Sequence, residues 1–140
     1  MPSFEFKLIE NPEAKNETLH ISSKIIGRAR RKRFKGFLMV MRFIDEDTKQ
    51  IVLYAPSFEV SGYGETEDKA FEMLKNSLDN TFSYLSNLSL DDLRTELNKL
   101  GWRKNRLRNK DFSRLTVDED GNLNGLNAEN NKVERLALVA

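Results

Sequence analysis

The chain has 140 residues, of which 39% are hydrophobic, 23 are basic and 22 are acidic, and it contains no cysteine. This length suits one domain, here residues 1–140, that can bury a core without metals or disulfides. Missing cysteine excludes disulfides and thiolate metal sites, and residues 1–10 lack the apolar stretch of a secretion signal. With a mean hydropathy of -0.60, we expect a cytoplasmic protein without a membrane segment.

The first part of the chain shows patterns that are typical of strands. Residues 4–8 alternate between apolar and polar side chains, and residues 19–25 continue this alternation after a turn. Residues 37–44 and 51–54 are mostly apolar at both odd and even positions, so both faces of each strand would be apolar. They flank an acidic turn at 45–49. They predict an antiparallel hairpin that is covered on both faces and lies at the centre of a sheet.

Two helices are predicted over the segment 66–100. Pro56 ends the preceding strand, and residues 58–64 predict a glycine-containing loop. Thr66 and Ser89 are suitable N-caps for the two helices. Their apolar stripes consist of Ala70, Phe71, Leu74, Leu78, Phe82 and Leu85, and of Leu90, Leu93, Leu97 and Leu100.

The end of the second helix and the end of the chain complete the expected fold. Gly101 stops the helix, and Trp102 can fold back onto its apolar stripe. Residues 133–139 predict a closing strand. The fold class is therefore α+β, with an antiparallel sheet of about four to five strands and two helices packed on it.

The most specific pattern joins a strand to the first helix. The strand ends in Tyr54 and Pro56, the loop ends in Gly64 and Thr66, and the helix begins with an acidic turn before Ala70. This pattern resembles the HicB-like family, the antitoxin half of bacterial HicA–HicB toxin–antitoxin pairs, in a stand-alone subgroup without an evident C-terminal DNA-binding domain. The resemblance implies a partial ribonuclease H-like fold. It also implies a non-catalytic module that neutralises a small, RNA-cleaving, HicA-like toxin by covering its RNA site.

The residues themselves offer no catalytic apparatus. His20 is the only histidine and cysteine is absent, so neither a nucleophilic triad nor a multi-histidine metal site can form. A ribonuclease H site would need several carboxylates on adjoining strands to hold Mg²⁺. Here the acids fall in turns and at helix starts, and the expected core strands lack them. We expect no enzymatic activity, no cofactor and no bound metal.

The clearest functional signal is the clustering of basic residues in two short segments of the chain. Residues 24–35 carry seven basic and no acidic side chains, and a second basic run spans 103–110. In an extended chain the first run would place cations on both faces, so it must form a solvated loop, an arm or a projecting edge ribbon. The candidate contact residues are Arg28, Arg30, Arg31, Lys32, Arg33, Lys35, Arg103, Lys104, Arg106 and Arg108.

Three interpretations of these basic residues remain open. They can contact the phosphate backbone of RNA or DNA, as a free-standing nucleic-acid-binding protein would. They can dock on an acidic protein surface, because arginine pairs well with carboxylates. They can also protect an edge strand from aggregation. Phe34, Phe37 and Tyr63 could stack on bases beside these cations, although aromatic residues more often lie in the core.

Other residues suit a protein partner. The predicted loop offers Phe58, Tyr63 and Glu65 as partner-facing candidates. A toxin that binds RNA is basic and would be repelled by the basic run, so the acids suit this contact better: Asp45, Glu46, Asp47, Glu65 and Asp68. Because two short helices cover only one sheet face, the other face needs the N-terminal strands or a second copy, and we expect a homodimer.

Overall fold

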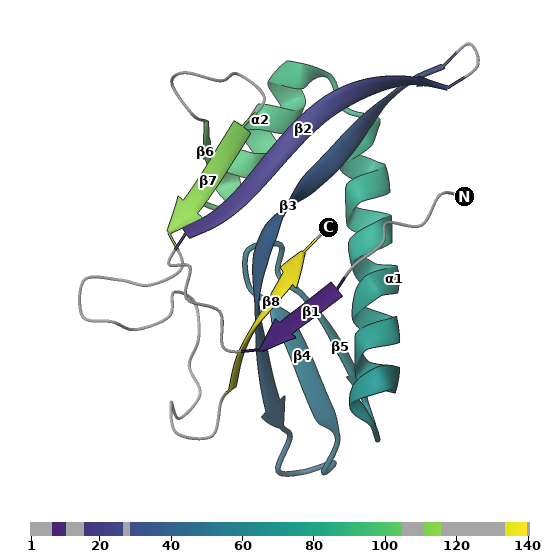
Figure 1. Ribbon diagram of the computed structural model, residues 1–140, viewed down its shortest axis with the longest axis vertical. Coiled ribbons are helices and arrows are strands. Elements are labelled where there is room, and N and C mark those ends of the chain that lie inside the picture. Colours follow the sequence, from purple (N-terminus) through teal and green to yellow (C-terminus); the bar gives the residue numbers. More distant parts are fainter. Residues whose placement is uncertain (1–6, 11–15, 27–28, 105–110, 116–133, 140) are drawn as a thin grey trace.

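The computed structural model describes residues 7–10, 16–26, 29–104, 111–115 and 134–139 (Figure 1). These ranges contain one eight-stranded sheet. Its strands are β1 (Lys7–Glu10), β2 (Asn16–Ile26), β3 (Ala29–Ile44), β4 (Ile51–Ala55), β5 (Val60–Gly64), β6 (Arg103–Lys104), β7 (Asp111–Leu115) and β8 (Glu134–Val139). The two helices are α1 (Glu67–Ser86) and α2 (Leu90–Lys99).

Strand β3 is the spine of the sheet, which is antiparallel throughout. The strand order is β1-β8-β3-β2-β7-β6, with β4 joined to β3 and β5 joined to β4. Two strands share one edge of β3: β2 pairs with its first part, up to Phe37, and β4 pairs with its last part, from Met41 onward. Strand β8 pairs along the opposite edge over Phe37–Arg42. Three residues, 38–40, therefore lie between the two partners that share one edge.

The α+β class, the central hairpin, both helices and the closing strand are confirmed. The sheet has eight strands and not the expected four or five. The additional strands include β6 and β7, which follow Trp102, where the sequence pattern weakens. Strand β1 is an edge strand of this sheet and pairs with β8. The first expected strand, 4–8, overlaps it at Lys7 and Leu8, and residues 4–6 lie outside the described part.

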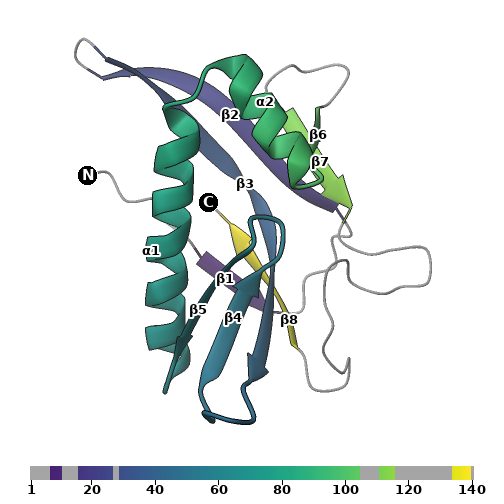
Figure 2. The same ribbon diagram turned by 180° about the vertical axis from the view of Figure 1, so that it is seen from behind.

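Both helices lie on the same face of the sheet (Figures 1 and 2). The hydroxyls of Thr66 and Ser89 accept hydrogen bonds from the N–H groups of Lys69 and Asp92, so both expected N-caps are confirmed. Helix α1 buries Ala70, Leu74, Leu78, Phe82 and Leu85 against the sheet. Helix α2 buries Leu93 and Leu97, whereas Leu90 is exposed. No described helix combines the length and the apolar character that a bilayer crossing requires.

The expected loop over 58–64 is wrong for most of its length. Residues 56–59 form a tight turn, and strand β5 then runs back along β4. Gly62 belongs to β5 and faces α1, where a Cβ atom would lie only 2.2 Å from the Ala70 carbonyl oxygen. This glycine allows the helix to approach the sheet closely, which explains why a residue typical of loops occupies a strand.

The face opposite the helices is also partly apolar. Met39, Met41 and Ala137 lie on this face, because successive strand residues alternate and Leu38 and Leu138 pack in the helix-covered core. All three are at most 1% exposed in the single chain. A second copy is therefore not required to bury these three side chains. The homodimer remains a prediction, but the need to cover this face no longer supports it.

Candidate binding surfaces

The first basic run forms the outer part of a long β2–β3 hairpin. The two strands remain in register from Thr18 opposite Phe37 to Ile26 opposite Ala29. Strand β7 accompanies β2 only as far as His20, so the hairpin continues as a two-stranded ribbon (Figure 1). A projecting ribbon was one of the three forms expected for this run. Arg30 and Arg31 lie in β3, and Arg28, Arg106 and Arg108 lie outside the described residues.

One face of the hairpin packs against the helices. Phe34 is buried there and stacks on Phe82 with ring centroids 5.0 Å apart, so it does not offer a surface for bases. Lys32 lies on the same face, and its Nζ donates to the carbonyl oxygens of Ser86 and Leu88. These carbonyls lie at the end of α1, whose last turn has no basic residue of its own. Lys32 therefore stabilises the negative end of the helix dipole and is not a free contact residue.

The other face of the hairpin presents cations to solvent. Arg33 and Lys35 are exposed, and in the described part of the chain no hydrogen bond or ion pair engages them. Arg103 in β6 is exposed as well, and its Nη1 donates to the carbonyl oxygens of Asn98 and Trp102. Lys104 is half-buried. The structure thus separates the basic candidates into two groups. Lys32 and Arg103 donate to carbonyl oxygens at the ends of the helices, whereas Arg33 and Lys35 are exposed on the hairpin face opposite the helices.

The acidic residues gather at the other end of the molecule. Strand β3 ends, β4 begins and β5 ends at this point, where Ile44 pairs with Ile51 and Ile51 pairs with Gly64. The β3–β4 turn and the start of α1 are therefore neighbours. Residues 42–50 and 64–72 carry seven acidic and three basic side chains. We call this region the acidic end; its candidate contact residues are Asp45, Glu46, Asp47, Glu65 and Asp68.

The acidic end is held in place by specific contacts. Arg42 forms an ion pair with Glu67 at 2.7 Å, which ties β3 to the first turn of α1. The Thr48 hydroxyl donates to Asp45 at 2.6 Å and is the main cause of a pKa of Asp45 below its usual value. The Asp45 carboxylate therefore keeps its negative charge at neutral pH.

The partner-facing candidates from the predicted loop do not share one surface. Tyr63 is 51% exposed and Glu65 is exposed at the acidic end. Phe58 is only 5% exposed, because the tight turn after Pro56 directs it into the core against Phe82 and Trp102. The proposal that Phe58 faces a partner is wrong.

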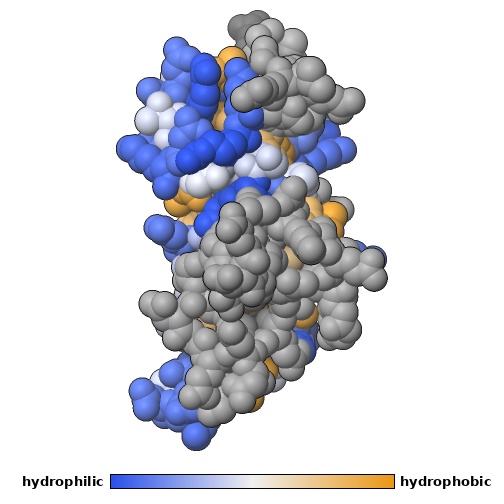
Figure 3. Space-filling model, turned by 90° about the vertical axis from the view of Figure 1, so that its left-hand side faces the viewer, coloured by the Kyte–Doolittle hydropathy of each residue, from blue (hydrophilic) through white to orange (hydrophobic). Residues whose placement is uncertain are grey.

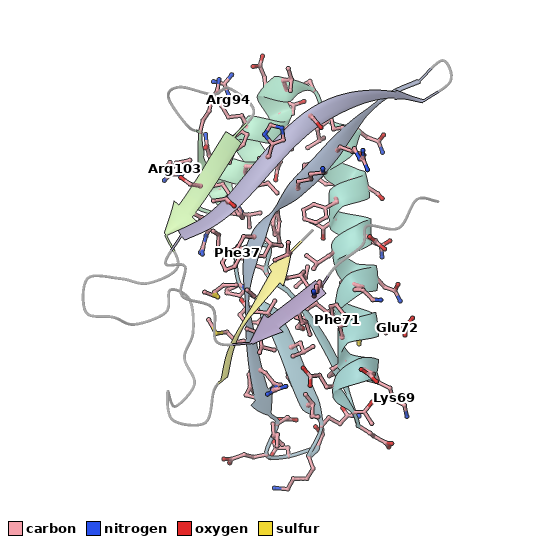
Figure 4. The ribbon with its side chains drawn as sticks, in the orientation of Figure 1. Phe37, Lys69, Phe71, Glu72, Arg94 and Arg103 are labelled. Atoms are coloured by element: carbon pink, nitrogen blue, oxygen red, sulfur yellow. The ribbon has the colours of Figure 1, made fainter. Side chains whose placement is uncertain are left out.

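The two charged regions are well separated. In the space-filling view, hydrophilic residues gather at the upper end and at the lower end of the molecule (Figure 3). Figure 4 shows Arg103 beside α2 at one end, and Lys69 and Glu72 near the start of α1 at the other. A net charge of +1 thus conceals two surfaces of opposite sign.

A buried ion pair, which no pattern in the sequence indicated, joins β2 to β7. Glu17 in β2 is fully buried, and its Oε1 accepts a bond from Arg114 Nη1 in β7 at 3.2 Å. Its Oε2 accepts the N–H of Met39 at 2.9 Å, in the gap where β3 changes partner from β2 to β4. Arg114 Nε also donates to the Leu100 carbonyl at the end of α2, 2.8 Å away. The pair therefore fastens β2, β3, β7 and α2 together.

Glu17 corrects the expectation that the core strands lack acids. Burial raises the pKa of this carboxyl, and the bond from Met39, the Ser57 hydroxyl and the charge of Arg114 oppose the rise. The buried Ser57 hydroxyl lies near the carboxylate but forms no hydrogen bond of ordinary geometry within the described residues. A single buried carboxylate that is bonded to a guanidinium and to a backbone N–H holds strands together, and we assign Glu17 this structural role.

No candidate catalytic centre comes together in the part of the chain that the structure describes. His20 lies exposed on β2, as expected of an ordinary strand residue. Within the described ranges, no three histidine, aspartate or glutamate side chains are grouped so that they could hold a metal ion. Comparisons with known protein families, with curated proteins and with solved structures give no match. The resemblance to HicB-like antitoxins therefore depends on the sequence pattern alone.

Proposed function

We propose that the protein is a non-catalytic, antitoxin-like binding module whose acidic end docks on a small, basic, RNA-cleaving protein. The observation that carries this proposal is the meeting of two acidic segments, 45–47 and 65–68, at one end of the sheet. A protein that binds RNA presents a basic surface, and a fixed acidic surface complements it. Docking there excludes RNA by steric and electrostatic competition, and no bond is made or broken.

The acidic end has properties that suit such a contact. Complementary charge accelerates association and suppresses contacts with acidic proteins. Tyr63, exposed beside Glu65, adds an aromatic side chain of the kind that concentrates binding energy at protein interfaces. The ion pair between Arg42 and Glu67 fixes the surface in advance, which lowers the entropic cost of docking.

Co-purification with the products of neighbouring genes tests this proposal. We expect the tagged chain to retain a small basic protein encoded beside its own gene. Replacing three exposed acids together (Asp47→Asn, Glu65→Gln and Asp68→Asn) should weaken the complex at least tenfold, mainly by slower association at low salt. Calorimetry or surface plasmon resonance on the purified pair measures this change.

The matched control removes the same charge elsewhere. Asp91→Asn, Asp92→Asn and Glu96→Gln neutralise three acids of α2, outside the acidic end. This control should bind as the unmodified chain does. Equal weakening by both triple variants, or no bound neighbour product at all, would contradict the proposal.

A further inference from the structure

We infer a second binding surface: the sheet face opposite the helices binds single-stranded nucleic acid across strands β1, β8, β3, β2, β7 and β6. This function is separate from docking at the acidic end. It rests on a row of residues that the strand registers bring side by side, on the charge around that row, and on one aromatic residue in its middle.

The row crosses six strands without interruption. Lys7 pairs with Val139 and Val139 with Phe37, which places a cation two strands from the aromatic ring. On the other side, Phe37 pairs with Thr18, Thr18 with Ser113, and Ser113 with Arg103. At about 4.8 Å between strands, the row spans about 24 Å from Lys7 to Arg103.

Cations lie at both ends of this row and along one side of it, and the row itself contains no acid. Lys35 and Arg33 lie two and four residues from Phe37 along β3, so they share its face. Lys7, Arg33, Lys35 and Arg103 are exposed, although the guanidinium of Arg103 also donates to carbonyl oxygens at the end of α2. Among the described side chains on this face of the six strands, none is acidic; the others are Thr18, His20, Ser22, Phe37, Met39, Met41, Phe43, Ser113, Ala137 and Val139. A polyanion is the complementary partner.

Phe37 favours a single-stranded nucleic acid over other polyanions. Its side chain is half-buried and lies on the face away from the helices (Figure 4). A partly exposed aromatic ring on a sheet can stack on a base, and the cations at the ends and on one side of the row can hold the flanking phosphates. Thr18, which pairs with Phe37, and Ser113, one strand further along the row, are both exposed and supply hydroxyls for sugar or base edges. A paired duplex keeps its bases stacked inside and cannot use the ring.

Fluorescence anisotropy with a labelled single-stranded RNA tests this inference. Binding should weaken steeply with salt, with a slope that falls by about 0.7 for each phosphate contact removed. Arg33→Ala combined with Lys35→Ala should therefore reduce the slope by about 1.4. Phe37→Leu should lower the affinity about tenfold while leaving the slope unchanged, whereas Phe37→Tyr should retain binding. Circular dichroism verifies that each variant is folded.

The controls separate this surface from general charge and from the acidic end. Arg94→Ala with Lys99→Ala removes two exposed cations of α2 and should leave the slope unchanged. The triple variant of the acidic end should also bind RNA normally, so the two functions can fail independently. The inference is overturned if duplex DNA or polyglutamate binds as tightly as the RNA, if Phe37→Leu has no effect, or if RNA does not bind at low salt.

Discussion

Replacing Arg114 with methionine is expected to lower the free energy of unfolding by about 3–5 kcal/mol at neutral pH. The substitution leaves the Glu17 carboxylate buried without its counter-charge and the Leu100 carbonyl without its donor. Urea denaturation followed by fluorescence measures the effect, since Trp102 is the only tryptophan of the chain. The matched control is Lys69→Ala, which breaks the exposed pair with Glu65 and should cost about 0–1 kcal/mol.

The same variant should be sensitive to pH in a defined direction. The folded-state pKa of Glu17 is raised above its usual 4.5, so its ionisation costs stability as pH rises from about 4.5 through the folded-state value. Without Arg114, two of the influences that lower this pKa are lost and the rise becomes larger. The cost of Arg114→Met should therefore shrink as pH falls through the acidic range. A cost that stays constant or grows with acidity would contradict the assignment.

A double-mutant cycle separates the pair from its surroundings. Glu17→Leu together with Arg114→Leu should cost clearly less than the sum of the two single variants, because neither charge remains unpaired. A residual cost of about 1–3 kcal/mol is expected, since the buried N–H of Met39 loses its acceptor. Additive effects would show that the two side chains do not act together.

Replacing Trp102 with alanine is expected to cost about 3–5 kcal/mol. The indole is completely buried and packs on Phe58 with ring centroids 5.6 Å apart. Its Nε1 donates to the Ser57 carbonyl at 3.3 Å, which joins the end of α2 to the turn after β4. Trp102→Phe should cost less, because it fills most of the cavity and loses only this hydrogen bond. Thermal unfolding followed by circular dichroism measures both variants.

Exposed aromatic residues provide the comparison for Trp102. Tyr84 is 58% exposed on α1, so Tyr84→Ala should change the free energy of unfolding by no more than about 0.5 kcal/mol. If Trp102→Ala were as mild as Tyr84→Ala, the role of Trp102 as a plug at the end of α2 would be wrong.

Local signals in the sequence predicted the helical part of the fold. Thr66 and Ser89 are caps because their hydroxyls meet N–H groups three residues on, a relation that the sequence contains in full. Gly101 ends α2 with a φ of 96°, a conformation that glycine adopts easily. Trp102 follows directly and is buried in the same core cluster as Leu93 and Leu97 of α2.

Features that depend on distant partners could not be predicted in the same way. Gly62 in β5 has the composition of a loop, and only the nearness of α1 explains why glycine occupies a strand. Glu17 is acceptable in a core strand because Arg114, 97 residues away, neutralises it. Strand β7 has only a short alternation around Phe112, which was too weak to recognise without its partner β2.

The candidate surfaces show the same division. The basic and acidic runs were visible in the sequence, but their separation into two ends required the sheet topology. Alternation along β3 explains why Lys32 faces the helices while Arg33 and Lys35 face solvent. The row from Lys7 to Arg103 joins residues from six strands and has no counterpart in the linear sequence.

Inhibition of RNA cleavage tests the central claim most directly. A labelled RNA is incubated with the purified basic neighbour product while this chain is titrated into the reaction. We predict that cleavage stops when the chain reaches equimolar amounts, and that the triple variant of the acidic end requires at least tenfold more. Undiminished cleavage at a large excess of the chain, or cleavage of the RNA by the chain alone, would contradict the account.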